Sequence, residues 1–91
     1  MNPIHVKVIT PKGIAYEGDA LSVYVPATKG VIGVLPGHTP FIADLAEEGV
    51  LRIQDTMQRE SRFLIRGGAL EIKPEETIIL TGHSEPLKDQ A

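Results

Sequence analysis

Apolar and polar residues alternate along most of this chain, with the period of two that is typical of half-buried β-strands. Many of the apolar positions carry β-branched side chains, which favour the pleated surface of a sheet. Six runs show the pattern: Ile4, Val6 and Val8 around His5 and Lys7; Leu21, Val23 and Val25 around Ser22 and Tyr24; Leu51 and Ile53 around Arg52; Phe63 and Ile65 between Arg62, Leu64 and Arg66; Leu70 and Ile72 around Glu71; and Ile78 and Leu80 between Thr77, Ile79 and Thr81.

Glycine, proline and acidic residues separate these runs at intervals of about 8–12 residues, which is typical of a β-sandwich or barrel. The 91 residues are enough for one domain. We therefore predict an all-β fold of eight to ten short antiparallel strands, arranged as two sheets packed face to face in a β-sandwich over residues 1–83. Residues 54–60 are read as a long hairpin tip, with a short helix as the alternative. Residues 84–91 leave the strand pattern and are expected to form a flexible tail.

The composition limits the kinds of partner and chemistry. The net charge is −3, and the nine Lys and Arg residues form no cluster, which argues against a nucleic-acid partner. Cysteine is absent, so disulfides, thiolate nucleophiles and zinc–thiolate sites are excluded. No apolar run approaches the roughly 20 residues of a membrane-spanning helix. We expect a soluble, cytosolic protein, which could still sit on a membrane complex.

No recognisable catalytic or metal-binding pattern occurs in the sequence. The three histidines, His5, His38 and His83, show no helical metal-ligand spacing. The serines lack the context of a nucleophile elbow. Paired acids at 47–48 and 75–76 fall at turns, where solvated carboxylates are the simplest interpretation. We therefore predict no catalytic, metal-binding or cofactor-binding residues.

The segment "GVIGVLPGHTP", residues 30–40, combines three glycines, two prolines and a histidine. It lacks the Gly-Lys-Ser/Thr of a phosphate loop, and the prolines at 26 and 36 argue against the helices that would flank an RNA-binding G-x-x-G loop. Gly30 and Gly33 permit a positive φ or a close backbone approach. Pro36-Gly37 favours a type II turn with Gly37 at positive φ. We interpret the segment as preset backbone for docking, with His38 displayed at the surface.

The same segment, extended to "KGVIGVLPGHTPFIADL", resembles the signature of the epsilon subunit of F-type ATP synthases, in which a G-x-x-G-x-x-P-G-H-x-P core is characteristic. The opening "HVKVITPKGIAYEGDALSVYVPATKG" looks like the start of that family's N-terminal domain. The stretch "FLIRGGALEIKPEETIIL" is similar to its double-glycine segment and last strands. The resemblance covers about residues 4–82 and keeps the order of the three segments.

The resemblance implies a ten-stranded β-sandwich at the foot of the central rotor stalk, on the cytoplasmic face of the membrane or its organelle equivalent. The subunit would be non-catalytic and without a cofactor, would link the gamma subunit to the c-ring, and would couple ion-driven rotation to ATP synthesis. Carried over by position, the residues toward gamma would be Thr10, His38, Thr39, Pro40 and Ala43. The residues toward the polar loops of the c-ring would be Lys29, Gly30, Val31 and Ile32.

The chain departs from the family pattern at two places. Val31 stands where members often carry an acidic or polar residue, so an apolar contact would replace a polar one. The family also continues into a C-terminal helical hairpin, and this chain stops at Ala91, as either a short form or a fragment. Two other hypotheses remain open: a generic β-sandwich module for protein interaction, and a small β-barrel enzyme or nucleic-acid binder.

Overall fold

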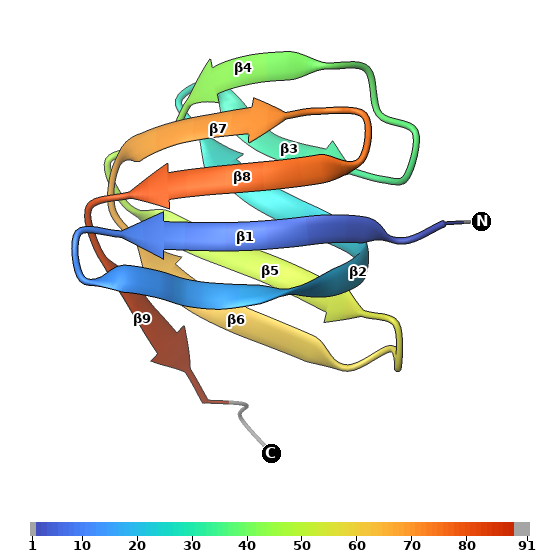
Figure 1. Ribbon diagram of the computed structural model, residues 1–91. Coiled ribbons are helices and arrows are strands. Elements are labelled where there is room, and N and C mark those ends of the chain that lie inside the picture. Colours follow the sequence, from blue (N-terminus) through green and yellow to red (C-terminus); the bar gives the residue numbers. More distant parts are fainter. Residues whose placement is uncertain (1, 89–91) are drawn as a thin grey trace.

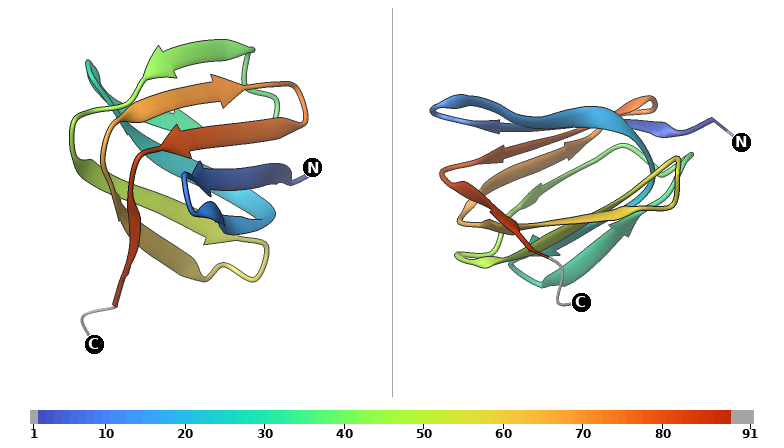
Figure 2. Two further views of the ribbon diagram at one scale, coloured as in Figure 1. Left: turned by 60° about the vertical axis from the view of Figure 1, so that its left-hand side comes forward. Right: turned by 90° about the horizontal axis from the view of Figure 1, so that it is seen from below.

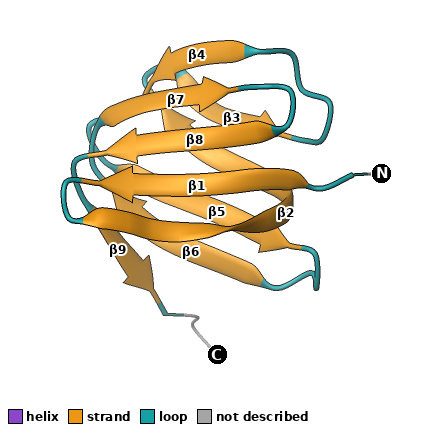
Figure 3. Cartoon of the chain, in the orientation of Figure 1, coloured by secondary structure: helices purple, strands orange, loops and turns teal. Residues whose placement is uncertain are grey.

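A computed structural model of the chain describes residues 2–88. All regular secondary structure in that range consists of β-strands (Figures 1 and 3). The all-β sandwich is therefore confirmed, with nine strands in place of about ten. No segment of the described range forms a helix long and apolar enough to cross a membrane. The strands are β1 Ile4–Thr10, β2 Gly13–Ala27, β3 Gly30–Val34, β4 Phe41–Asp44, β5 Gly49–Asp55, β6 Glu60–Ile65, β7 Gly68–Ile72, β8 Glu76–Thr81 and β9 Ser84–Leu87.

The long strand β2 belongs to both layers of the sandwich. The strand order is β4-β7-β8-β1-β2-β5-β6-β9, and β3 lies beside β2. The first half of β2 pairs with β1, and its second half pairs with β5 and β3. An irregularity between Ala20 and Ser22 marks the change of layer, because an extra residue bends the strand. Figure 2 shows β2 passing from the layer of β1 to that of β5.

One strand pair runs against the expectation of an antiparallel sandwich. β1 and β8 are parallel, with His5 opposite Glu76 and Ile9 opposite Leu80. The alternation of apolar residues sets which side of a strand is buried, and it carries no information on the direction of the neighbouring strand. The sheet is therefore mixed, although all the other pairings between strands are antiparallel.

The core lies between the two layers and is almost entirely aliphatic. The fully buried side chains include Val6 and Val8 from β1, Val23 and Val25 from β2, Leu51 and Ile53 from β5, Ile65 from β6, Leu70 from β7 and Ile79 from β8. The predicted alternation is confirmed in most runs. It is wrong around Leu21, which is only half-buried while Ser22 is buried, because the irregularity in β2 shifts the pattern by one residue.

In β8 the alternation places the threonines and the middle isoleucine inside, and the other two apolar residues outside. Thr77, Ile79 and Thr81 face the core, while Ile78 is half-buried and Leu80 is 49% exposed. The ladder with β1 sets this orientation, because Thr77 pairs with Val6 and Ile79 with Val8. The Thr81 hydroxyl also forms hydrogen bonds with the main chain of Arg66. It lies 3.2 Å from the amide nitrogen and 3.1 Å from the carbonyl oxygen of that residue. The orientation set by the ladder with β1 thus leaves the side chains of Ile78 and Leu80 on the outside.

The ends of the chain and the 54–60 segment differ in how far they follow the sequence prediction. Residues 54–60 form a hairpin tip, as predicted, in which Asp55 Oδ1 accepts hydrogen bonds from the amides of Met57 and Arg59. The expected tail is wrong for Ser84–Leu87, which form β9 and pair with Arg62–Ile65 of β6. Residues 89–91 of that tail lie outside the described residues.

The glycine- and proline-rich segment adopts the turn that its sequence predicts. The amide of His38 donates to the carbonyl of Leu35 at 3.1 Å, and Gly37 has a φ of 85°, as a type II turn requires. Gly30 also has a positive φ, of 124°. Gly33 is a case of close approach instead, since a Cβ there would lie 3.2 Å from the ring of its cross-strand partner Tyr24.

We predict that Gly37→Val destabilises the fold by about 1–3 kcal/mol, because it forces a β-branched residue into the left-handed region. Nothing lies within 4 Å of a Cβ at Gly37, so the effect isolates backbone strain. The measurement is urea unfolding. Gly18→Ala is the control, because Gly18 lies inside β2 without a left-handed φ. Equal stability of Gly37→Val and the parent would contradict the assigned turn.

His5 joins β1 to β2 through both of its ring nitrogens. Nε2 lies 2.9 Å from Glu17 Oε2, and Nδ1 lies 3.1 Å from Asp19 Oδ1. These hydrogen bonds, first to Glu17 and then to Asp19, raise the pKa of His5 above its usual 6.5. The hydrogen bond from His5 in turn lowers the pKa of Glu17 below 4.5. The contribution of protonated His5 to stability is present below pH 6.5 and lost as the pH rises through its raised pKa. That of ionised Glu17 is present above pH 4.5 and lost as the pH falls through its lowered pKa.

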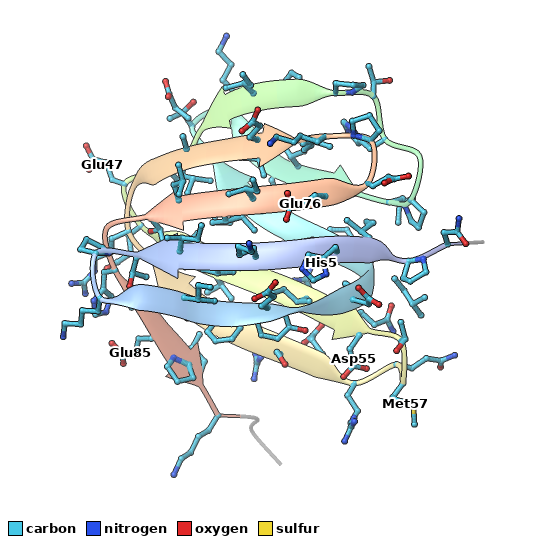
Figure 4. All side chains as sticks on the ribbon, in the orientation of Figure 1. His5, Glu47, Asp55, Met57, Glu76 and Glu85 are labelled. Carbon is cyan, nitrogen blue, oxygen red and sulfur yellow. The ribbon has the colours of Figure 1, made fainter. Side chains whose placement is uncertain are left out.

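We therefore predict that Glu17→Gln lowers the titration midpoint of His5, because it removes the first of the two carboxylates that favour the imidazolium. The measurement is an NMR titration of the His5 ring signals between pH 5 and 8, the range of the ordinary histidine titration. Glu47→Gln is the control, since Glu47 lies at the other end of the sandwich from His5 (Figure 4). An unchanged midpoint in Glu17→Gln would show that the pair is not formed in solution.

Candidate functional site

A groove opens between β3 and β4, where the two layers of the sandwich are not joined by a strand. It has a volume of about 410 Å³ and is lined by residues 27–32 and 41–44. At one end, main-chain hydrogen bonds close it: the Thr28 amide donates to the Asp44 carbonyl at 3.1 Å, and the Ala46 amide to the Pro26 carbonyl at 3.0 Å. Beyond this point β3 pairs only with β2, and β4 only with β7, so each has a free edge.

Both walls of the groove carry exposed apolar side chains. Val31 is 65% exposed on β3, while Phe41 and Ile42 are 45% and 72% exposed on β4. Ile32 is half-buried and packs against the core. Large exposed apolar side chains that gather at two free strand edges are typical of a site that another protein covers.

All four residues predicted to face the c-ring lie together in this groove. Lys29 and Gly30 form the β2–β3 turn and the start of β3, and Val31 and Ile32 follow on that strand. Ala43, predicted to face gamma, lines the opposite wall on β4. The structure thus brings together, at one groove, residues that the sequence reading had divided between two partners.

The other residues predicted to face gamma are dispersed. Thr10 ends β1 beside the 11–12 turn, whereas His38, Thr39 and Pro40 belong to the β3–β4 loop at the opposite end of the sandwich (Figure 1). The Thr10 hydroxyl is engaged in its own turn, where it donates to the Gly13 carbonyl at 3.2 Å and accepts from the Lys12 amide at 3.1 Å. Thr10 and His38 therefore belong to one interface only if it extends along the whole length of the sandwich.

His38 is held by its own loop. Its Nδ1 lies 2.7 Å from the Thr39 carbonyl oxygen, and its ring centroid is 6.4 Å from that of Phe41. The side chain is half-buried between the turn and the start of β4. This geometry fits a residue that fixes the loop and offers one ring edge to a partner.

The three histidines lie apart, each with its own partners. His5 contacts Glu17 and Asp19, while His83 Nε2 lies 3.3 Å from Glu85 Oε1. Within residues 2–88 no group of three or more histidine or acidic side chains is placed to hold a metal ion. The feature that stands out among the described residues is instead the groove with its exposed apolar side chains.

Sequence reasoning missed part of the groove wall, namely Phe41, Ile42 and Asp44. The available signal was the pair of adjacent apolar residues after Pro40. Successive side chains of a strand point to opposite faces, so one of two adjacent apolar residues must lie on the outer side. An exposed apolar side chain of this kind indicates a contact surface.

The sequence matches the family described as ATP synthase, Delta/Epsilon chain, beta-sandwich domain over residues 3–86. Similar proteins include the ATP synthase epsilon chains of an Exiguobacterium species, 36% identical over 93% of this chain, and of Prochlorococcus marinus, 40% identical over 91%. That of Anoxybacillus flavithermus is 39% identical over 98%. The chain spans 62%, 60% and 65% of the lengths of these three relatives.

Solved structures support the fold. A chain in the Euglena gracilis mitochondrial ATP synthase structure of OSCP, F1 and c-ring superposes with a TM-score of 0.87 at 19% identity, covering 94% of this chain and 54% of that one. A chain in the Tetrahymena thermophila central stalk and c-ring structure gives a TM-score of 0.74 at 15% identity, covering 90% and 65%. Together, the match over residues 3–86 and the sandwich that it describes show that this chain belongs to the family of the ATP synthase delta/epsilon chain β-sandwich domain.

Proposed function

We propose that the chain is a non-catalytic subunit of the central stalk of an F-type ATP synthase. In this role it links the gamma subunit to the c-ring and couples ion-driven rotation to ATP synthesis. The observation that carries the proposal is the family match over residues 3–86, together with relatives that bear the name ATP synthase epsilon chain. The chain is then peripheral to the membrane, on its cytoplasmic face or the organelle equivalent.

The groove supports the contact with the ring. Lys29, Gly30, Val31 and Ile32 line it together, next to two free strand edges and exposed apolar side chains. Val31 is 65% exposed in the groove. We expect it to contact an apolar side chain on the polar loop of the ring. Gamma binds along β4 and the β3–β4 loop, where Ala43 and His38 lie, and Thr10 extends this interface to the end of β1.

The proposal predicts that the chain restores coupling. Membrane vesicles that carry the ATP synthase of the source organism are stripped of its epsilon chain, and the chain is added back. ATP synthesis driven by an imposed ion gradient should recover, because the rotor again joins gamma to the ring. Failure of the chain to bind the stripped complex would refute this role. The alternative hypothesis, a generic β-sandwich module for protein interaction, would then be favoured.

A second prediction concerns the groove. Val31→Lys should weaken binding to the stripped complex by about tenfold, equivalent to roughly 1.4 kcal/mol, because it places a charge in an apolar contact. Met57→Lys is the matched control, since Met57 is 71% exposed at the tip of the β5–β6 hairpin (Figure 4). Equal binding of both variants in a sedimentation assay would exclude Val31 from the contact.

A further inference from the structure

His5 lies in a cluster of charged side chains contributed by three neighbouring strands. Glu17 and Asp19 of β2 contact its two ring nitrogens, at 2.9 Å from Nε2 and 3.1 Å from Nδ1. On the other side of β1, His5 is opposite Glu76 of β8 in the parallel ladder (Figure 4). Lys7 belongs to the same cluster, since its Nζ lies 3.9 Å from Glu17 Oε2. One imidazole and one ammonium group thus share the acidic side chains of two adjacent strands.

The two contacts of the ring require that both of its nitrogens carry a proton. An ionised carboxylate only accepts hydrogen bonds, and a neutral imidazole carries one N–H donor, whereas an imidazolium carries two. His5 can therefore donate to Glu17 and Asp19 at the same time only in its charged form. The same two hydrogen bonds, first to Glu17 and then to Asp19, raise the pKa of His5, in agreement with this geometry.

Loss of one proton from the ring leaves the cluster one donor short. Lys7 can replace that donor at Glu17, because its Nζ is already within ion-pair distance of this carboxylate. Asp19 has no ion-pair partner other than His5 within residues 2–88. Both carboxylates keep a partner if the remaining proton is on Nδ1, facing Asp19, while Glu17 pairs with Lys7. A remaining proton on Nε2 would instead place a lone pair against Asp19.

We propose that His5, Glu17, Asp19 and Lys7 form a proton-dependent clamp between β1 and β2. In the charged state, His5 holds both carboxylates. When the Nε2 proton passes to solvent, Glu17 moves to Lys7, and Asp19 alone stays hydrogen-bonded to the ring. The proton can leave directly, because the side chain of His5 is 38% exposed. The clamp thus changes from two hydrogen bonds to one as the pH rises.

The clamp lies next to the bend through which β2 changes layer. Asp19 immediately precedes Ala20, where the ladder with β1 ends and the ladder with β5 begins. The hydrogen bonds of His5 therefore reinforce the last residue pairs of β1 and β2 before the bend. The proton on His5 consequently controls how firmly the start of β1 is held to the strand that joins the two layers.

The clamp loosens on the alkaline side of the ordinary histidine titration. Because the pKa of His5 is raised above 6.5, the extra stabilisation is present below pH 6.5 and lost as the pH rises through the raised pKa. The pKa of Glu17 is lowered, so Glu17 remains an acceptor throughout this range. The segment of β8 packed beside His5 contributes Glu76 and, before it, Glu75, whose carbonyl accepts the His5 amide at 3.4 Å. Neither of these two carboxylates forms an ion pair with the ring.

The first experiment is an NMR titration of the imidazole nitrogens of the parent chain from about pH 5 to about pH 9. Above the midpoint of His5, the remaining proton should be on Nδ1, and the carboxylate signal of Glu17 should shift at the same midpoint. His83 is the internal control, because it contacts one carboxylate only, that of Glu85. A neutral His5 with its proton on Nε2 would overturn the transfer of Glu17 to Lys7.

The second experiment compares the melting temperatures of folded variants over the same pH range. The parent should lose stability as His5 titrates, and His5→Gln should not show this loss, because it has no proton to release. Lys7→Met should enlarge the loss, because Glu17 then has no second partner when His5 is neutral. Lys12→Met is the matched control, since Lys12 forms no ion pair in the described part of the chain and should behave like the parent.

Two results of this comparison would contradict the clamp. The same dependence on pH in the parent and in His5→Gln would show that the proton on His5 does not hold β1 to β2. The same loss of melting temperature in Lys7→Met and Lys12→Met would show that Lys7 does not receive Glu17. Both results concern the stability of the isolated chain and leave the proposed function unchanged.

Discussion

The bend in β2 is the constraint on which the rest of the structure depends. One continuous strand pairs with β1 in the first layer and with β5 and β3 in the second, so both layers are fixed relative to each other by covalent connection and by hydrogen bonds. The irregularity between Ala20 and Ser22 makes this possible, because it turns the strand and changes which side chains face inward. Val6 of β1, opposite Gly18 before the bend, and Val23 of β2, opposite Ile53 after it, then meet in one interior.

The same constraint leaves the sandwich open on one side. β3 can pair only with the second half of β2, and β4 returns to the other layer beside β7. The two strands are joined at one end through Thr28 and Asp44 and diverge beyond it, which creates the groove. The other edge of the path, β9, contains Pro86, which lacks the amide hydrogen that a further strand would need. The free edges of β3 and β4 thus coincide with residues 29–32 and Ala43, which the sequence resemblance predicts at an interface.

The orientation of β8 sets its sequence pattern against its burial. Thr77 and Thr81 occupy the core side, although the Thr77 hydroxyl has no hydrogen-bond partner within residues 2–88. Ile78 and Leu80 are on the outside. For stability alone, the reverse arrangement of polar and apolar residues would be expected. A local conflict between sequence pattern and burial is where functional demands on a sequence are expected to be visible. Leu80, which pairs with Ile9 on one side and Ala69 on the other, is the clearest case, since it is 49% exposed.

The sequence by itself determined the class of fold, the positions of most strands and the Pro36-Gly37 turn. These features depend on short-range chemistry: period-two burial, the fixed φ of proline and the left-handed φ open to glycine. It also predicted residues 29–32 as one contact segment, and the structure places them together in the groove. Tertiary structure alone decided that β1 and β8 run parallel, that Ser84–Leu87 add a strand, and that Thr10 lies far from His38. It also placed Ala69, Leu80, Ile9 and Ile14 beside one another across four neighbouring strands. Each of these outcomes depends on which distant strands pair and in which register, and no local pattern of hydrophobicity encodes that choice.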